Sequence, residues 1–429
     1  MFARIRLFGD RRAAQAPLPP AGPAFPPREA FAPSPHFPEH HPRLLALRRA
    51  FTPTRPQRSF RRVAGRKAEL LRILDAIADN RSHVVLYGDR GRGKTSIVNL
   101  VAAAARSSGY IVGRYSCDHD SNFDDIMRGL MRDLPKSALA VAVENDADLE
   151  GCEAALPAAR VLPRDVAQLP ARLIGGHVLL IVDEFDRVAD VPTRTRLADT
   201  IKQVSDRGSP LSFLIVGVSD SLQELLGHHP SIQRNVTAVP LPLLSEADAN
   251  EIIDMGAREA ELEFPPRIRQ TITRFARGVP YVVHLLALHF GEQALRRGAT
   301  AVNRNDILPA FAQAAAEMSP HVSLVYDRLT AGEFCTAMRD LLVRLALTEH
   351  DGFGLLAATQ SDGALRVAGQ VTQQALWQRL LDTGAVRPCF GTSGGLYSVT
   401  EPMLLHYVLL RAVLDSDIAS DPARTAALA

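Results

Sequence analysis

The sequence lacks the features that mark secreted, zinc-stabilised or membrane-spanning proteins. Its 4 cysteines (Cys117, Cys152, Cys335 and Cys389) are scattered and form no Cys-X-X-Cys pair, which argues against a disulfide framework or a zinc site and favours a reducing compartment. No apolar run approaches the roughly 20 residues that span a bilayer. The N-terminus shows no secretory signal, so we expect a soluble cytoplasmic protein without a membrane partner.

Charge of one sign is not in excess either. The 49 Lys and Arg residues nearly balance the 47 Asp and Glu residues, for a formal net charge of +2. The whole molecule is therefore not predicted to bind a polyanion, although a local basic face remains open. Histidines such as His228 and His229 lack metal-ligand spacing, and we assign them no function.

Proline, in contrast, is concentrated near the N-terminus. It crowds residues 17–56, and because it resists both helix interiors and sheets, we expect a disordered tail over residues 1–57. A tail that docks onto a partner or onto the nucleotide domain is the alternative. A second short tail is expected over residues 418–429.

Between the tails, the hydrophobic pattern predicts three domains. Over residues 58–244, short apolar strands alternate with amphipathic helices, which predicts an α/β fold with a parallel sheet covered by helices on both faces. Residues 245–318 read as about four helices, a helical lid. Residues 319–417 follow the order helix, helix, hairpin, helix, which predicts a winged helix. The expected strands are residues 83–87, 110–117, 177–185, 211–221 and 236–241.

The stretch between the first strand and the next helix satisfies the phosphate-binding pattern GxxxxGK[ST] in full. Glycines let the backbone amides converge on one anion, and the following helix adds its positive end. Lys94 is predicted to reach the outer phosphates, and the Thr95 hydroxyl to bind Mg²⁺. The predicted loop comprises Gly88, Asp89, Arg90, Gly91, Arg92, Gly93, Lys94, Thr95 and Ser96.

A second apolar strand ends in two carboxylates, Asp183 and Glu184. In open parallel sheets, ligands bind at the carboxyl edge where such strands end. Asp183 is predicted to hold Mg²⁺ and Glu184 to polarise the water that attacks the γ-phosphate; the alternative is a strand ending in solvated acids. Asp186 is expected to cap a turn. No [NT]KxD guanine-reading sequence follows, so adenine is the favoured base and ATP the expected ligand.

These motifs together resemble the AAA+ and STAND branch of P-loop ATPases, most closely in the style of origin-recognition and initiator ATPases. The resemblance covers residues 62–298. It implies that Gly65 and Arg66 lie where the chain passes the adenine, and that the tip of the fourth strand, Ser219 or Asp220, is a sensor. Because a carboxylate would repel the γ-phosphate, Ser219 is preferred.

The resemblance also implies a role for Arg234 and for the lid. Arg234 lies where the family carries an arginine finger that completes a neighbour's site, which would require a homo-oligomer in the ATP state; an ordinary surface arginine is the alternative. Gly278, Val279 and Pro280 resemble the GxP motif of STAND proteins, which are often slow nucleotide-controlled switches. The same residues also suit a plain helix start.

The winged helix leaves its partner open. Its second helix offers Gln370, Gln373, Gln374, Gln378 and Arg379, which can contact DNA, but few basic residues accompany them. Trp377 is expected in the core.

Three hypotheses remain: an ATP-hydrolysing switch, a DNA-binding initiator- or transposition-type ATPase that recruits or loads a partner protein, and a non-catalytic ATP-binding scaffold. The identity of a protein partner is not predicted.

Overall fold

The computed structural model describes twelve stretches of the chain, and all structural statements concern these. The chain divides into Met1–His41 and Pro42–Ala429, and the described residues all belong to the second unit. They are residues 42–55, 64–79, 82–138, 151–173, 177–219, 222, 225, 234–332, 334–348, 356–357, 370–389 and 396–419.

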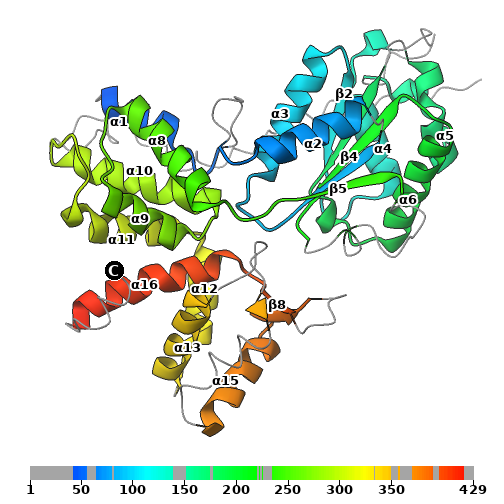
Figure 1. The fold of residues 1–429 in the computed structure, drawn as a ribbon. Coiled ribbons are helices and arrows are strands. Elements are labelled where there is room, and N and C mark those ends of the chain that lie inside the picture. The colour runs from blue at the N-terminus through cyan, green and yellow to red at the C-terminus, as the bar shows by residue number, and fades with distance from the viewer. Residues whose placement is uncertain are drawn as a thin grey trace, which may run out of the picture. The chain divides into compact units, whose positions relative to one another are not determined.

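Five parallel strands form the predicted α/β sheet, in the order β2-β3-β4-β1-β5 (Figure 1). All six residues of β3 and all seven of β4 are buried, because helices cover both faces of a parallel sheet. Neighbouring strands are in register through pairs such as Val85 with Ile215 and Ile181 with Leu214. The strands are β1 (His83–Tyr87), β2 (Ile111–Ser116), β3 (Val178–Asp183), β4 (Leu211–Gly217) and β5 (Val236–Pro240).

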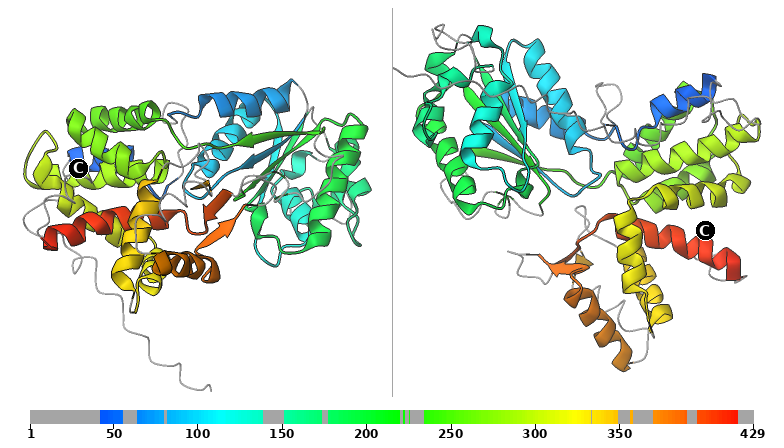
Figure 2. Two further views of the ribbon diagram at one scale, coloured as in Figure 1. Left: turned by 60° about the horizontal axis from the view of Figure 1, so that its bottom comes forward. Right: turned by 180° about the vertical axis from the view of Figure 1, so that it is seen from behind.

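The alternation of side chains along each strand builds a separate core on each face of the sheet. Val84 and Leu86 pack against α2 (Lys67–Ala78) and α3 (Lys94–Ser107). Val85 packs on the opposite face with α4 (Phe123–Arg132), α5 (Pro163–Ala167) and α6 (Val191–Asp206). Figures 1 and 2 show these two helical layers. The layers leave the carboxyl ends of the strands as the edge where a ligand can approach.

Helix α4 was not predicted, and its N-terminus explains why it forms. The Asn122 side chain accepts hydrogen bonds from the amides of Asp124 and Asp125, and the Asp125 carboxylate reaches back to the Asn122 amide. This capping box satisfies amides that the first helical turn leaves unpaired. In its described part, the region between α4 and β3 contains only short helical pieces, such as α5 (Pro163–Ala167).

Four helices form the predicted lid. They are α8 (Glu246–Ala260), α9 (Pro266–Ala276), α10 (Pro280–Arg296) and α11 (Ile307–Glu317). Ser245 caps α8 through a capping box with Asp248, and prolines begin α9 and α10, where a missing backbone amide costs nothing.

The expectation of a tail over the whole of residues 1–57 is wrong for its last part. Helix α1 (Pro42–Ala50) packs against α8 and α10, with Leu44 and Leu47 buried beneath it. A glycine on α10, Gly291, makes room for Leu47, since a Cβ at Gly291 would lie 2.7 Å from that side chain. The prediction took the prolines as a sign of disorder, but proline is favourable at the first position of a helix, as in α1. Residues 1–41 lie outside the described residues.

The C-terminal elements follow the predicted order, with additions. The first predicted helix is divided into two, α12 (Pro320–Leu329) and α13 (Cys335–Leu347). Gly332, at φ 92°, lies in the turn between them. Strands β7 (Val386–Pro388) and β8 (Leu396–Val399) form the predicted antiparallel hairpin, and an unpredicted strand β6 (Leu356–Ala357) pairs with β8. Helices α15 (Gln370–Asp382) and α16 (Met403–Ala419) complete this part.

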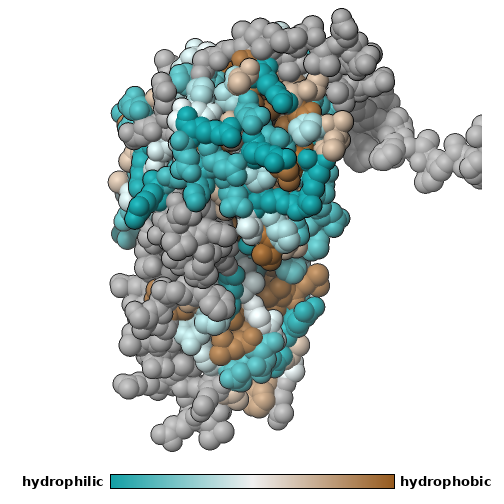
Figure 3. All heavy atoms as spheres, turned by 90° about the vertical axis from the view of Figure 1, so that its right-hand side faces the viewer, coloured by the Kyte–Doolittle hydropathy of each residue, from teal (hydrophilic) through white to brown (hydrophobic). Residues whose placement is uncertain are grey.

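Within the described residues, no helix has the length and apolarity to cross a membrane. On the face drawn in Figure 3, hydrophilic side chains cover most of the described surface in the upper part of the view, and hydrophobic ones form separate patches. Trp377 packs edge-on against Tyr397, with ring centroids 5.3 Å apart, but it is only half-buried and so lies at the margin of the core where the prediction put it inside.

Candidate nucleotide site

The loop between β1 and α3 has the backbone shape of an anion cradle. Gly88, Gly91 and Gly93 all have positive φ, at 145°, 78° and 91°, a region that side-chain-bearing residues rarely adopt. A Cβ at Gly88 would also lie 3.1 Å from the Leu241 carbonyl. Helix α3 begins directly after the loop, at Lys94, so its unpaired amides face the same space.

A buried arginine inside the loop holds its shape. Arg92 donates from Nη1 to the Leu241 carbonyl at 2.9 Å and from Nη2 to the Asp89 carboxylate at 2.5 Å. A charge-assisted pair of this kind is stronger than a neutral hydrogen bond. Arg92 and Asp89 therefore brace the loop against the end of β5.

The Lys94 ammonium lies where backbone carbonyl oxygens of the loop converge. Its Nζ donates to the carbonyls of Gly88 at 2.7 Å and Asp89 at 2.9 Å. Burial lowers the pKa of Lys94 to about 8, against the opposing effect of nearby carboxylates, chiefly those of Asp89 and Asp186. An ammonium that is this poorly solvated gains strongly from an added anion.

The two carboxylates after β3 are held differently. Asp183 is only 9% exposed and is fully engaged: Arg114 of β2 donates to Oδ2 at 2.5 Å, and the amide of Glu184 donates to Oδ1 at 2.9 Å. Glu184 is 51% exposed and pairs with Arg187 at 2.9 Å. Its backbone has φ 54°, a strained conformation that turns the side chain away from the strand direction.

Asp186 ties the ends of two neighbouring strands together. Its Oδ1 accepts a hydrogen bond from the amide of Val218 at 2.8 Å, just beyond β4. The close approach explains Gly217, where a Cβ would lie 3.1 Å from the same oxygen. Asp186 thus joins β3 to β4 and does not merely cap its own turn.

Of the two residues of the predicted adenine-side segment, Gly65 packs against the lid and Arg66 binds the chain just before it. Gly65, at φ 64°, lies so close to Asp248 of α8 that a Cβ would overlap that side chain. Arg66 is buried and donates from Nη2 to the Pro242 carbonyl at 2.6 Å. Burial lowers the pKa of Arg66, but its neighbour Glu69 counteracts the shift.

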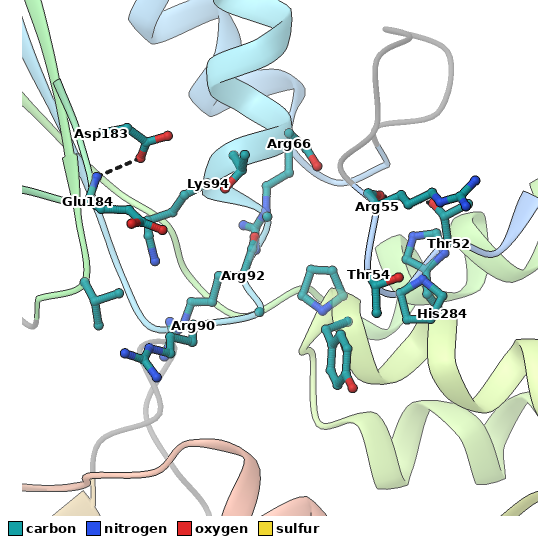
Figure 4. Close-up of a pocket in the computed structure, with 18 of the residues that line it drawn as sticks. Thr52, Thr54, Arg55, Arg66, Arg90, Arg92, Lys94, Asp183, Glu184 and His284 are labelled. Carbon is teal, nitrogen blue, oxygen red and sulfur yellow. Dashed lines mark hydrogen bonds between the residues drawn. The ribbon is translucent and has the colours of Figure 1, made fainter. Parts of the chain in front are cut away.

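These groups surround a cavity of about 650 Å³, a size typical of small-molecule sites. Figure 4 shows its two ends: Lys94, Asp183 and Glu184 at one end, and Thr52, Arg55 and His284 at the other. The phosphate-loop residues 90–96 line the first end. Ala64, Ile252, Pro280 and Tyr281 also contribute to the wall.

The structure brings most of the predicted site residues together, but not all. Arg66, Lys94, Thr95, Ser96, Asp183, Glu184 and Pro280 line the main cavity. Ser219 lines a second cavity of about 450 Å³ beside it, with Asp89, Arg90 and Asp186. Gly65 supports the wall from behind. Arg234 is exposed in the turn before β5 and lines none of the three cavities found among the described residues. Asp220 lies outside the described residues.

Sequence reasoning missed the residues that come from outside the motifs. Arg114 lies in an ordinary-looking strand, and its only signal is a charge on the face that meets the end of β3. His284 and Tyr281 follow the Gly-Val-Pro sequence on α10, and residues 52–55 lie in the segment that was expected to be a tail. Nothing in the sequence indicates that these residues lie at the nucleotide site. Only the fold brings them there.

Comparisons with known proteins agree with this geometry. The loop, the strand edge and the sheet have the arrangement of the P-loop ATPase fold. More specifically, residues 62–216 match the family model described as AAA ATPase domain. No curated protein matches the sequence.

Solved structures extend the likeness in fold. A Walker-type ATPase of Pyrococcus abyssi is 14% identical with a TM-score of 0.51, over 84% of this chain and 99% of that one. The Orc1 protein of Aeropyrum pernix, solved with DNA, is 18% identical with a TM-score of 0.45, over 86% and 98%. RuvB of Thermotoga maritima, a Holliday junction branch migration motor, is 16% identical with a TM-score of 0.42, over 82% and 97%. Only the first likeness is close enough to indicate a shared fold.

Proposed function

We propose that the protein binds Mg·ATP in the main cavity, hydrolyses it slowly, and uses the nucleotide state to control contacts made by its lid and C-terminal part. The observation that carries the proposal is that three parts of the chain meet at one loop glycine. A Cβ at Gly91 would lie 3.1 Å from Met403 of α16 and 3.2 Å from Val279 of the lid. The Gly91 carbonyl also accepts a hydrogen bond from the Tyr281 amide at 3.3 Å.

The phosphate end supports the chemistry. The loop amides and Lys94 would hold the phosphates, and the Lys94 ammonium would exchange its two carbonyl partners for phosphate oxygens. Glu184, exposed and set on a strained turn, would orient and polarise the attacking water. Arg66 would steady the loop, and Ser219 would respond to the γ-phosphate through Asp186, which is bonded to its neighbour Val218.

The donor set suits Mg²⁺ better than a metal held by protein alone. Among the described residues no cluster of three or more His, Cys, Asp or Glu could hold a metal ion, whereas Mg²⁺ typically takes one or two protein oxygens plus phosphate and water. Thr95 and Asp183 would hold it, with Asp183 acting through water because both its oxygens are engaged. When bound, Mg²⁺ would neutralise charge on the phosphates.

The coupling to the C-terminal part has two further contacts. Arg277, after α9, donates to the Thr348 carbonyl at 2.6 Å, and His406 of α16 hydrogen-bonds the Phe275 carbonyl at 2.9 Å. A loop that rearranges around phosphate would therefore move against α16 and the lid together. The predicted winged helix, which contains α16, would then change its contacts with the nucleotide state.

The test compares wild type with Glu184→Gln, using Asp206→Asn as an exposed control. We expect Glu184→Gln to bind ATP normally but to turn over at least about 100-fold more slowly, since a positioned general base contributes on that order. Hydrogen exchange of residues 402–410 should differ between the ATP state of this variant and the ADP state. Unchanged turnover would indicate a non-catalytic scaffold.

The DNA-associated alternative concerns helix α15. Two of its candidate contact residues are engaged within the chain: Arg379 donates to the carbonyls of Arg328 and Ala331, both at 3.2 Å, and Gln378 bonds Asp382 at 2.8 Å. DNA binding would require these bonds to open. ATP turnover stimulated by duplex DNA would favour this alternative over the switch.

Arg234 is proposed to act in a second copy of the chain. It is exposed two residues before β5, an edge strand of the sheet, where a neighbour could approach. Turnover per chain should then rise with protein concentration. Adding inactive Glu184→Gln protein should restore turnover to Arg234→Ala, because its intact Arg234 can complete a neighbour's site. A rate independent of concentration would contradict this role.

A further inference from the structure

The smallest of the three cavities is lined by three separate parts of the chain. It measures about 50 Å³, which is room for a few water molecules or one small ion, since one water fills about 10–15 Å³ of such a space. The phosphate loop, the turn between α9 and α10, and the start of α16 all contribute to its wall. Lys94, Thr95 and Asp183, which line the main cavity, do not line this one, so it is not the nucleotide site.

Arg277 brings a buried positive charge to this cavity. Its guanidinium donates to the Thr348 carbonyl at 2.6 Å, and a neutral acceptor of this kind does not cancel the charge. Burial by itself lowers the pKa of Arg277 to about 10, whereas at Arg66 the neighbouring Glu69 counteracts the same effect. Arg277 is therefore charged at pH 7. A buried cation is costly unless a negative charge accompanies it.

His406, which also lines the cavity, stays neutral. Its Nδ1 donates to the Phe275 carbonyl at 2.9 Å, because a carbonyl oxygen can only accept. Burial lowers the pKa of His406 to about 4, and the nearby charge of Arg277 acts in the same direction. The imidazole therefore adds no charge near pH 7, and it neither repels an anion nor balances Arg277.

The phosphate loop adds a second positive charge. Among the described lining residues, Asp89 is the one acid, and its carboxylate already pairs with Arg92 at 2.5 Å. Arg90, in contrast, is exposed and forms no hydrogen bond or ion pair with another described residue. Three arginines thus face one aspartate around a small space. The excess of positive charge in the wall is that of Arg90 and Arg277.

The first turn of α16 faces the same space. Pro402, Leu405 and His406 line the cavity, and α16 is a 17-residue helix that begins at Met403. The N-terminus of a helix carries a partial positive charge, which also favours an anion. The Glu401 carboxylate moderates this effect, since it accepts a hydrogen bond from the Met403 amide at 3.5 Å, but Glu401 lines the neighbouring cavity and not this one.

We propose that this cavity binds one small monovalent anion such as chloride, held by Arg277 and Arg90. The anion joins the phosphate loop, the lid and the start of α16, because all three contribute to its wall. A dianion such as phosphate suits the site less well, since it is larger and the Asp89 carboxylate also faces the space. The inference does not depend on the proposed function, and its test needs no nucleotide.

Binding is measured directly from the line width of the chloride signal in nuclear magnetic resonance. A chloride ion held by a protein relaxes fast, so exchange with the bound ion broadens the signal, and added bromide should compete and narrow it again. The wild type should show this bromide-sensitive broadening, and Arg277→Met should lose it. Arg277→Lys, which keeps the charge, should retain part of it. Arg267→Met is the matched control, the same change at an exposed arginine of α9, and should behave as the wild type does.

Unfolding by urea gives an independent readout. The midpoint is compared in potassium chloride and in potassium glutamate of equal ionic strength, because glutamate is too large for the cavity. Chloride at ten times its dissociation constant should raise the ratio of folded to unfolded wild type about elevenfold, since it binds the folded state alone. Effects of the salts on the general surface act on wild type and Arg277→Met alike, so the difference between the two proteins reports the site.

The outcomes separate an ion from water. If Arg277→Met does not fold, Arg90→Met replaces it in both measurements and should weaken the broadening and the chloride effect on the midpoint. Bromide-sensitive broadening that is absent from the wild type, or equal in wild type and variant, means that the cavity holds water only and overturns the proposal. The same conclusion follows if the two salts shift the midpoint of wild type and variant equally.

Discussion

The two ends of the main cavity are built in opposite ways. The phosphate end comes from one short loop and the strand edge beside it, and its groups are already paired: Lys94 with loop carbonyls, Asp183 with Arg114. The other end is assembled from segments far apart in the chain, residues 52–55, Ile252 and α10, and it contains an unpaired atom, His284 Nδ1. The first end therefore depends on local backbone shape, whereas the second depends on how distant segments of the chain pack.

The largest change in stability should come from removing the packing behind the end of the cavity that lies away from the phosphate loop. Phe51→Ala deletes a fully buried ring and should lower the free energy of unfolding by about 4 kcal/mol, measured by denaturant titration. ATP affinity should fall as well, because the turn of residues 52–55 loses its anchor. Phe334→Ala is the control, since Phe334 is 47% exposed; an equal loss in both variants would show that Phe51 is not a structural anchor.

At the phosphate end, Lys94→Ala should weaken ATP binding by about 100-fold, near 3 kcal/mol, without destabilising the fold. The ammonium makes charge-assisted bonds that alanine cannot replace. Titration calorimetry with Lys67→Ala, an exposed lysine at the start of α2, provides the comparison. Affinity that survives the change would remove the basis of the phosphate site.

The two ends should give opposite pH dependences: ATP affinity should fall at alkaline pH, and the free energy of unfolding should fall at acid pH. As pH rises through about 8, Lys94 loses its proton, so ATP affinity should fall above that pH, by at most about tenfold per unit. As pH falls below 6.5, the unfolded chain protonates His284 before the folded chain does, since the folded pKa is about 4. The free energy of unfolding should therefore decrease from pH 6.5 toward pH 4, by up to roughly 1.4 kcal/mol per unit.

His284→Phe separates these contributions. The substitution should remove the part of the acid dependence of the free energy of unfolding that His284 contributes. It should leave the fall in ATP affinity at alkaline pH unchanged. Two other buried histidines with a pKa of about 4, His83 and His406, should preserve the remaining acid sensitivity. An alkaline fall that disappears in His284→Phe would contradict the separation of the two ends.

The smallest effect should come from Arg114→Met. Removing the guanidinium frees Oδ2 of Asp183, so the Mg²⁺ concentration that half-saturates ATP binding should fall about threefold, as one competing charge near the surface implies. Arg207→Met, at an exposed arginine after α6, should leave it unchanged. A higher Mg²⁺ requirement would mean that Arg114 orients the carboxylate instead of competing for it.

Much of the fold could be predicted because its patterns are local. The five strands are runs of apolar residues, so they were predicted near their observed bounds. The lid helices repeat apolar residues with helical spacing, so their number and the residues they span together were predicted. Helix α4 was not predicted, although Phe123, Ile126, Met127, Leu130 and Met131 repeat with helical spacing after the capping residue Asn122. Strand β6 was not predicted because a strand of two residues is too short to show an alternating pattern. Helix α1 was not predicted because its prolines suggested disorder.

The sequence alone determined the phosphate loop and the carboxylates after β3, because an anion cradle is made by consecutive backbone amides and by one strand end. Tertiary structure decided which arginine engages Asp183, how residues 52–55 reach the cavity, and why Phe51 lies over Gly256, where a Cβ would overlap its ring. Those relations join residues that only folding brings close. Pairing across such distances depends on the complementary shape of packed helices, which no short stretch of sequence records.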